Sequence, residues 1–241
     1  MYNLEDAHFW YVGMRSIITS ILDRVVFPPH PEILDAGCGT GANLKYLNRY
    51  GSTTGVDISP LALKYCVKRG FKNVRQGSID KLSFQDNTFD LITCFDVLGH
   101  ARVNEGRALS EFYRVLKPGG LLLLRTPAYP WLSSEHDQIV QNVRRHTRHS
   151  IQTLLSGINF LPVRFTYANM FLFPLIALKR ILFTVIHYQS NHSDTIAVSP
   201  AFNSLLLLPF KIEVFLLNYF NLPFGLSLIV LAHKPCKKYI I

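Results

Sequence analysis

The chain has 241 residues, enough for one sizeable domain, and 49% of them are hydrophobic, which is ample for a buried core. Lys and Arg outnumber Asp and Glu by 25 to 16, and the net charge of +9 favours nucleic acid, anionic lipid or a small anionic substrate without choosing among them. The four cysteines are widely spaced and form no CxxC pair. This spacing argues against a metal site or a disulfide framework and favours a reducing cytoplasm.

The N-terminal stretch MYNLEDAHFWYVGMRS contains two acids among its first six residues and lacks the apolar core of a secretory signal. Longer apolar runs are also poor membrane spans. Residues 165–178 stop at a Lys-Arg pair, and residues 214–232 are broken by Asn, Pro, Gly and Ser. We expect a cytoplasmic protein, with peripheral contact to a membrane as the alternative.

Short apolar strands alternate with helical segments between residues 12 and 127, which is typical of βαβ units. Helices are predicted from about Ala42 (GANLKYLNRY), at PLALKYCVKRG and at ALSEFYRVLKPGG, the last ending on Pro-Gly-Gly. The strands are predicted at 32–37, 52–59, 74–78, 89–97 and 119–127. We therefore expect an α/β fold, with a Rossmann-like, mostly parallel sheet that carries helices on both faces.

Beyond residue 127 the predicted elements are a short helix at IQTLLSGINF, a sixth strand at 161–169 and a seventh strand at 226–234. An apolar insertion at 170–222, with helical stretches around Phe171 to His187 and Phe202 to Phe220, separates the last two strands. A single domain over 1–241 is predicted. Its parts are 1–30 (N-terminal helices), 31–127 (cofactor-binding core), 128–169 (loop, helix and strand), 170–222 (helical insertion) and 223–241 (last strand and tail).

The stretch ILDAGCGTGANL has three glycines at every second position directly after the first strand. Gly37, Gly39 and Gly41 allow a sharp turn and a close approach of the backbone to a ligand. The spacing GxGxG differs from the GxGxxG of dinucleotide-binding proteins, which argues against an NAD-dependent oxidoreductase. Asp57 follows Gly37 by about 20 residues, the separation at which an acid binds ribose hydroxyls. Its alternative role is a turn or capping acid, because DISP opens a helix.

The stretches ILDAGCGTGANL, GVDIS, FDLITCFDVLGH and LKPGGLLLLRTP resemble, in order and spacing, the motifs of class I S-adenosylmethionine (SAM)-dependent methyltransferases of the bacterial small-molecule type. The resemblance covers roughly residues 8 to 170 and implies seven strands with the last one antiparallel. It implies SAM as the cofactor. The methionine part of SAM would then contact Asp35, Gly37, Cys38, Gly39 and Gly41.

The same resemblance assigns the rest of the cofactor site. Asp57 would bind the ribose and Ile58 would pack on adenine. Where the family commonly has an acid for the adenine amino group this chain has GSID, so Ser78 and the Ile79 backbone would take that place. The cofactor and the acceptor would meet at Asp96, Val97 and Leu98.

Two further features of the family bear on the site. The commonest motif has Glu before His100 where this chain has Gly99, which speaks against a carboxylate-rich metal site, and no metal ligand is assigned. The segment HFWYVGMR at 8–15 resembles a lid over the cofactor, in which Arg15 would approach the SAM carboxylate. Its aromatic residues could equally belong to the core.

Candidates for proton transfer and for acceptor binding lie beyond strands four and five, because ligands of open α/β sheets bind at the carboxyl ends of the strands. They are His100, His136 and the basic run RRHTRH, of which Arg144, Arg145 and His146 are assigned. Each has an alternative: a capping or packing role for His100, a loop role for His136, and a solvated charged face for the basic run.

The acceptor is predicted from two features. The apolar insertion favours a largely apolar small molecule or peptide, and the basic run favours an anionic or acidic group on it, with methylation on oxygen and N-methylation as the alternative. The insertion could instead be a homodimer or membrane-surface patch. A catalytically weak SAM-binding partner protein and a nucleic-acid methyltransferase are the rival functions. No nucleic acid is expected, since the chain lacks the Asp/Asn-Pro-Pro-aromatic motif.

Overall fold

The structure is a computed structural model, and it describes residues 2, 4–133, 137, 139, 141–185 and 199–236. Seven strands form one sheet in the order β3-β2-β1-β4-β5-β7-β6. Their bounds are β1 Glu32–Ala36, β2 Ser52–Asp57, β3 Val74–Gln76, β4 Phe89–Phe95, β5 Leu116–Pro127, β6 Leu161–Ala168 and β7 Ser227–His233. Each predicted strand is present, and most bounds agree within one or two residues.

The sheet is parallel from β3 to β5 and antiparallel at its other edge. β1 pairs in parallel with both β2 and β4, whereas β7 runs antiparallel between β5 and β6. The strand order reverses at β1 and β4, which is the switch point where open α/β sheets bind ligands. The predicted fold class, including the antiparallel last strand, is confirmed.

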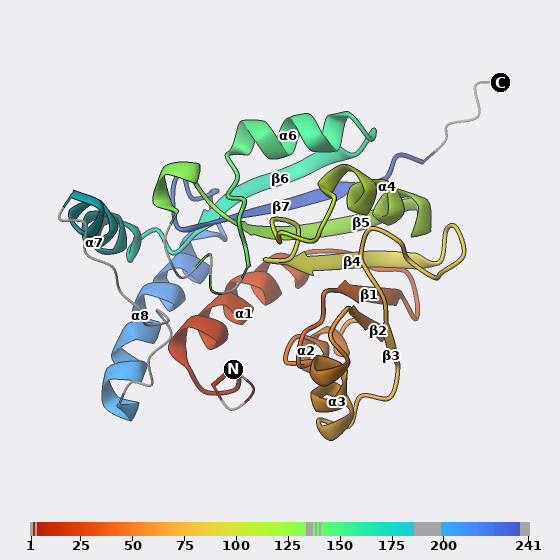
Figure 1. Ribbon diagram of the computed structural model, residues 1–241, viewed down its shortest axis with the longest axis horizontal. Coiled ribbons are helices and arrows are strands. Elements are labelled where there is room, and N and C mark those ends of the chain that lie inside the picture. The colour runs from red at the N-terminus through yellow and green to blue at the C-terminus, as the bar shows by residue number, and fades with distance from the viewer. Residues whose placement is uncertain are drawn as a thin grey trace.

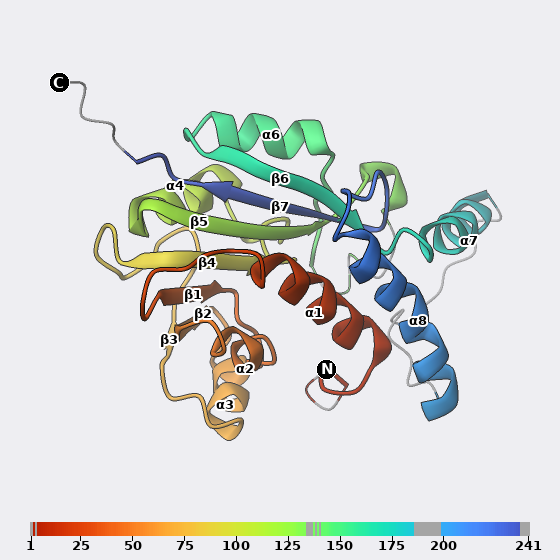
Figure 2. The ribbon, with the colours of Figure 1, turned by 180° about the vertical axis from the view of Figure 1, so that it is seen from behind.

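Helices cover both faces of this sheet (Figures 1 and 2). Their bounds are α1 Phe9–Leu22, α2 Leu44–Leu47, α3 Pro60–Lys68, α4 Glu105–Val115, η1 Pro130–Leu132, α6 Arg148–Ser156, α7 Phe173–Val185 and α8 Pro200–Leu216. The helix predicted from about Ala42 is wrong in extent, since α2 has four residues and begins at Leu44. Ser59 caps α3 as the Ser-Pro start predicts, with its hydroxyl accepting from the amide of Ala62.

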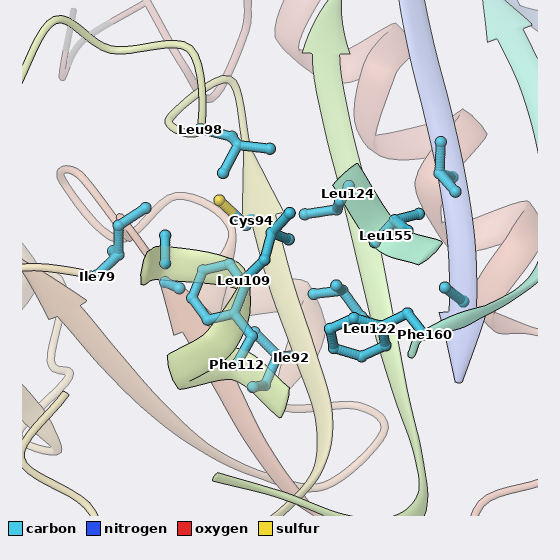
Figure 3. Packing of buried hydrophobic residues seen from close by; sticks show 14 of the residues in the cluster. Ile79, Ile92, Cys94, Leu98, Leu109, Phe112, Leu122, Leu124, Leu155 and Phe160 are labelled. Atoms are coloured by element: carbon cyan, nitrogen blue, oxygen red, sulfur yellow. The ribbon is translucent and has the colours of Figure 1, made fainter. Parts of the chain in front are cut away.

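Two hydrophobic cores lie on opposite faces of the sheet. On one face Ile92, Leu122 and Leu124 pack against Phe112 of α4 and Leu155 of α6 (Figure 3). The other face packs against α1 and α8. Its cluster includes Ile17 and Leu22 of α1, Leu91 and Leu123 of the sheet and Phe210 of α8. Alternating side chains along each central strand supply both cores.

The contact between α1 and α8 depends on a glycine. A β-carbon at Gly13 would lie 2.3 Å from the ring of Phe210, so only glycine lets the two helices approach this closely. Glu213 of α8 is also buried and accepts from the amides of Asn169 and Phe171, at 2.8 and 3.2 Å. The second half of α8 is thus fixed to the body of the domain.

Membrane insertion of a helix is not supported by the part of the chain that the structure describes. None of its helices combines the length and the hydrophobicity that crossing a bilayer requires.

Phe210 and Phe215 lie on the same helix but differ in environment, since their exposed fractions are 1% and 57%. We expect Phe210→Ala to lower the free energy of unfolding by about 3–5 kcal/mol, because it leaves a cavity against α1. Phe215→Ala should change it by less than about 0.5 kcal/mol. Urea unfolding measures both, and equal effects would contradict the packing of α8 on α1.

Candidate active site

The glycine loop (residues 37–41) joins β1 to α2. Gly37, Gly39 and Gly41 have φ of +84°, +54° and +83°, a left-handed region that side chains rarely adopt. A β-carbon at Gly37 would lie 2.4 Å from Val97 in the loop after β4, whereas one at Gly39 would meet no atom within 4 Å. Gly37 therefore permits close packing, and Gly39 faces open space that a ligand can enter.

Backbone hydrogen bonds hold the glycine loop against β2. The amides of Gly37 and Cys38 donate to the carbonyl of Val56, at 2.8 and 2.9 Å. Asp57 accepts from the amide of Gly39 at 2.9 Å and from the amide of Ser59 at 2.8 Å. It therefore acts as a turn acid, which was the alternative interpretation. Each carboxylate oxygen keeps a second acceptor position, so the ribose role stays a prediction.

Asp35 is a buried acid at the end of β1. Its Oδ1 accepts from the Thr93 hydroxyl at 2.7 Å, while its Oδ2 is buried and has no hydrogen-bond partner among the described residues. Burial raises the pKa of Asp35 to about 7, and the hydrogen bond from Thr93 opposes this shift. A bound cation would supply the missing partner.

Asp96 and Arg125 form an ion pair where β4 and β5 end. Arg125 donates from Nε and Nη2 to Oδ2 of Asp96, at 2.9 and 2.5 Å. Burial lowers the pKa of Arg125, but the charge and hydrogen bonds of Asp96 outweigh it, so the pKa lies above its usual value. Oδ1 of Asp96 is buried and, within the described chain, unpartnered.

Arg125 was missed by the sequence analysis. The signal was present, because a lone Arg near the end of the apolar strand GGLLLLRTP must have a partner when it is buried.

The N-terminal segment lies against the glycine loop through Glu5, and the lid role of residues 8–15 stays a prediction. The hydroxyl of Thr40 donates to Glu5, and Arg69 of the α3 C-terminus pairs with Glu5 at 3.2 Å and with Asp6 at 2.6 Å. Arg15 on α1 is half-buried, and burial lowers its pKa. Since no ion pair of Arg15 is found in the described part of the chain, its charge suits the predicted SAM carboxylate. Glu5 and Arg69 carried no recognisable sequence signal.

The predicted adenine site is only partly supported by the side chains. Ile58 is 51% exposed, so its side chain can pack on a planar ring. The hydroxyl of Ser78 donates to Asp80. Ile79 is buried in the core, as Figure 3 shows, and can offer only its backbone.

Two other residues that were predicted to contact the cofactor, Leu98 and Cys38, have buried side chains. Leu98 is buried in the same core cluster as Ile79 and Cys94 (Figure 3). Cys38 is buried beside Leu44 and Cys66. In each case the backbone can still contact the cofactor, so both contacts stay predictions.

The two adjacent arginines of the basic run are neutralised within the protein. Arg144 donates to the carbonyls of His100 and Val103, at 2.6 and 2.7 Å, and its Nε lies 3.0 Å from Glu105. Arg145 forms a bidentate pair with Asp137, with both distances 2.8 Å and both side chains buried. The expectation of free cations for an anionic acceptor is therefore not met by these two residues, and a catalytic role stays a prediction.

His146 is buried between two elements. Its Nδ1 lies 2.7 Å from the Thr126 hydroxyl and its Nε2 lies 2.9 Å from Glu105. Burial raises the pKa of Glu105, but the hydrogen bond and charge of His146 together with Arg144 bring it below its usual value. These contacts give His146 a structural role, and proton transfer by it stays a prediction.

Steric contacts explain why position 99 is a glycine. A β-carbon there would lie 2.3 Å from the carbonyl of Arg144 and 2.5 Å from Oδ1 of Asn142. The segment that carries the basic run packs directly on the backbone before His100. A Glu at this position, as in the commonest family motif, would have no room.

His100 is half-buried, and its Nδ1 accepts from the amide of Arg102 at 3.3 Å. Burial lowers its pKa, and the charges of Arg102 and Arg144 lower it further. His100 is therefore neutral near pH 7, which a general base requires. A cavity of about 480 Å³ lies beyond it and is lined by Arg102, Glu105 and Arg144 but by no residue of the glycine loop. His136, the other predicted base, lies outside the described residues.

The family model described as a methyltransferase domain matches residues 34–124. The 24-methylenesterol C-methyltransferase 3 of Arabidopsis thaliana is 28% identical over 141 residues, 52% of this chain and 38% of that protein. The phthiotriol/phenolphthiotriol dimycocerosates methyltransferase of Mycobacterium leprae is 37% identical over 98 residues, 38% of this chain and 36% of that protein. The aligned region therefore spans less than two-fifths of each of these curated relatives.

A solved structure of geranyl diphosphate methyltransferase in complex with SAM has a TM-score of 0.60 to this chain at 12% identity, covering 92% of this chain and 85% of that one. The family match over residues 34–124, the strand order and the glycine loop together identify a methyltransferase domain with the class I SAM-dependent fold. SAM is the cofactor of this class.

The residues at the carboxyl edge of the sheet fit SAM. The unpartnered oxygens of Asp35 and Asp96 suit its cationic ammonium and sulfonium groups, and Arg15 suits its carboxylate. The open side of Gly39 leaves room for its methionine part. Asp57 and Ile58 would hold its ribose and adenine.

Replacing Asp35 by Asn tests the buried charge. The raised pKa means that the folded protein loses stability as the pH rises from about 4 to about 7. Without SAM, Asp35→Asn should therefore be more stable than wild type at pH 8, with a smaller difference at pH 5. SAM affinity of the wild type should fall from pH 7.5 to pH 6, and the variant should bind weakly at both. Thermal unfolding and calorimetry measure these effects; a pH-independent wild-type affinity would contradict the assignment.

Gly39→Val should abolish SAM binding, because the new side chain fills the space that the glycine loop leaves open. The left-handed backbone adds a strain of about 1–2 kcal/mol. Gly70 is a matched control, since its φ is +92° and its β-carbon would also meet nothing within 4 Å. Gly70→Val should suffer similar strain but retain SAM binding in calorimetry. Micromolar affinity in a folded Gly39→Val protein would refute the assignment.

Proposed function

We propose that the protein transfers the methyl group of SAM to a largely apolar small molecule, on an oxygen atom. The observation that carries the SAM part is the glycine loop, with its open Gly39 beside the unpartnered oxygen of Asp35. SAM supplies an electrophilic methyl group on a positively charged sulfur. The protein must bind it, exclude water and align an acceptor opposite the carbon–sulfur bond.

The apolar character of the acceptor rests on an aromatic cluster (Tyr129, Trp131, Tyr167, Phe173 and Phe224) next to the end of β5. Tyr129 stacks on Tyr167 with ring centroids 5.4 Å apart and meets Phe173 at 5.6 Å. Trp10 of α1 packs near the same rings. Because β5 ends at the ligand-binding edge of the sheet, these rings can bind an apolar acceptor near the methyl group of SAM.

His100 is the candidate base for oxygen methylation. It would take the hydroxyl proton of the acceptor as the new carbon–oxygen bond forms and the carbon–sulfur bond breaks, which releases S-adenosylhomocysteine. Its lowered pKa keeps the imidazole neutral for this step.

A second candidate is methylation on carbon, and one observation favours it. The Arabidopsis relative is named a C-methyltransferase, and it aligns with half of this chain. Both named relatives are described as acting on sterol or phthiotriol acceptors. An apolar acceptor is common to the two proposals, and they differ in the atom that receives the methyl group.

The test uses methyl-labelled SAM with sterols, phenolic lipids, fatty acids and polar amines as separate acceptors. We expect label in an apolar product and equal release of S-adenosylhomocysteine, with Gly39→Val as the control that lacks SAM. Transfer only to polar amines would refute the apolar acceptor. SAM binding without transfer to any lipid or sterol class would refute turnover and favour a SAM-binding partner protein.

Once an acceptor is known, His100→Gln should lower kcat by about 10²–10⁴-fold with unchanged SAM affinity, since general-base catalysis is worth that much. The wild-type kcat/KM should fall at acid pH with an apparent pKa below 6.5, because burial and two arginines disfavour the charged imidazole. Normal turnover of His100→Gln would exclude His100 as the base.

A further inference from the structure

Helices α7 and α8 expose large apolar side chains that the domain does not cover. On α8 and the turn after it, Leu205, Leu208, Ile212, Phe215 and Tyr219 follow one another at alternating steps of three and four residues, and all are exposed. This spacing places them in one stripe along the helix. The stripe lies opposite Phe210, which packs on α1.

α7 carries a similar row. Leu175, Leu178 and Leu182 are exposed, whereas Ala177 is buried. Both helices lie at the end of the molecule where β4 ends (Figures 1 and 2). We call the two rows together the α7–α8 face.

The charges on these two helices have one sign at the surface. α7 contributes Lys179 and Arg180, and α8 contributes Lys211, of which Lys179 and Lys211 are exposed. Glu213, the acid within the two helical ranges, is buried and is held by the amides of Asn169 and Phe171. An anionic surface therefore complements the α7–α8 face, and the net charge of +9 acts in the same direction.

From these observations we infer that the α7–α8 face docks the protein on the surface of an anionic phospholipid bilayer. Interfacial helices combine apolar and aromatic side chains with cations and lie in the plane of the membrane. With 17 residues, α8 is about 25 Å long, which suits lying on a bilayer and not crossing it.

A second copy of the chain fits this face less well. A twofold pair would bring equally cationic faces together, and the stripe on α8 covers only about two heptads where coiled coils need at least three or four. Anionic lipid headgroups attract cations at about 1 kcal/mol for each Lys or Arg near the surface.

The face also continues into the proposed acceptor region. Phe173, at the start of α7, meets Tyr129 at 5.6 Å and Phe224 at 5.5 Å. Docking through the α7–α8 face would thus hold the aromatic cluster at the membrane, where apolar acceptors are found. Membrane docking itself does not depend on the proposed methyl transfer.

The experiment measures co-sedimentation of the full chain with vesicles of neutral phosphatidylcholine and of a mixture that contains about 30% phosphatidylglycerol. We expect binding to the anionic vesicles that weakens as salt is raised, because surface charge is screened. Absence of binding to the anionic vesicles at low salt would overturn the proposal.

Two matched variants locate the surface. Ile212→Glu places an acid on the stripe, and Val67→Glu places one on exposed α3; the two positions are 49% and 57% exposed. We expect at least about a tenfold loss of vesicle affinity for Ile212→Glu and a much smaller loss for Val67→Glu. Lys211→Gln should reduce binding only to the anionic vesicles.

Sedimentation in solution separates lipid from a second copy. If the wild type forms a stable dimer that Ile212→Glu dissociates, and neither protein binds vesicles, the face is a dimer interface and the proposal is wrong. Equal loss for Ile212→Glu and Val67→Glu would also overturn it, because general charge would then explain binding. SAM binding by each variant shows that it is folded.

Discussion

The turn after β1 is the constraint on which the candidate site depends. Three left-handed glycines bring the chain back over β2, where two amides share the carbonyl of Val56 and Asp57 holds the amide of Gly39. Side chains at these positions would cost strain or, at Gly37, collide with the loop after β4. The geometry of the cofactor site is therefore fixed by backbone before any side chain contributes.

The site contains two carboxylates that each have a buried oxygen atom. Within the described residues, Asp35 and Asp96 each keep a buried oxygen without a partner, and the raised pKa of Asp35 is the physical sign of that cost. A cationic cofactor offsets this cost when it binds. The apo protein is therefore less stable than its fold would allow, which is the usual compromise at functional sites.

The sequence was sufficient for the sheet and for the glycine loop, because strand periodicity and glycine chemistry act locally. It failed where a residue's partner lies far along the chain. The basic run looked available for a ligand, yet Arg144 and His146 share Glu105, which is about 40 residues earlier. The burial of the Leu98 and Ile79 side chains is also set by tertiary packing, which position in a motif does not reveal, and their contacts with the cofactor stay predictions.

One helix connects the cofactor site to the exposed apolar face. Arg15 on α1 interacts with the charges of Glu5 and Asp6, and Glu5 in turn contacts the glycine loop. Two residues before Arg15, Gly13 packs on Phe210 of α8, and the amide of Phe9 donates to Asn203 of α8 at 2.7 Å. Because there is no free space between Gly13 and the ring of Phe210, α8 cannot move toward α1 without displacing α1. The packing of Gly13 on Phe210 therefore positions both the exposed apolar stripe of α8 and Arg15 on α1.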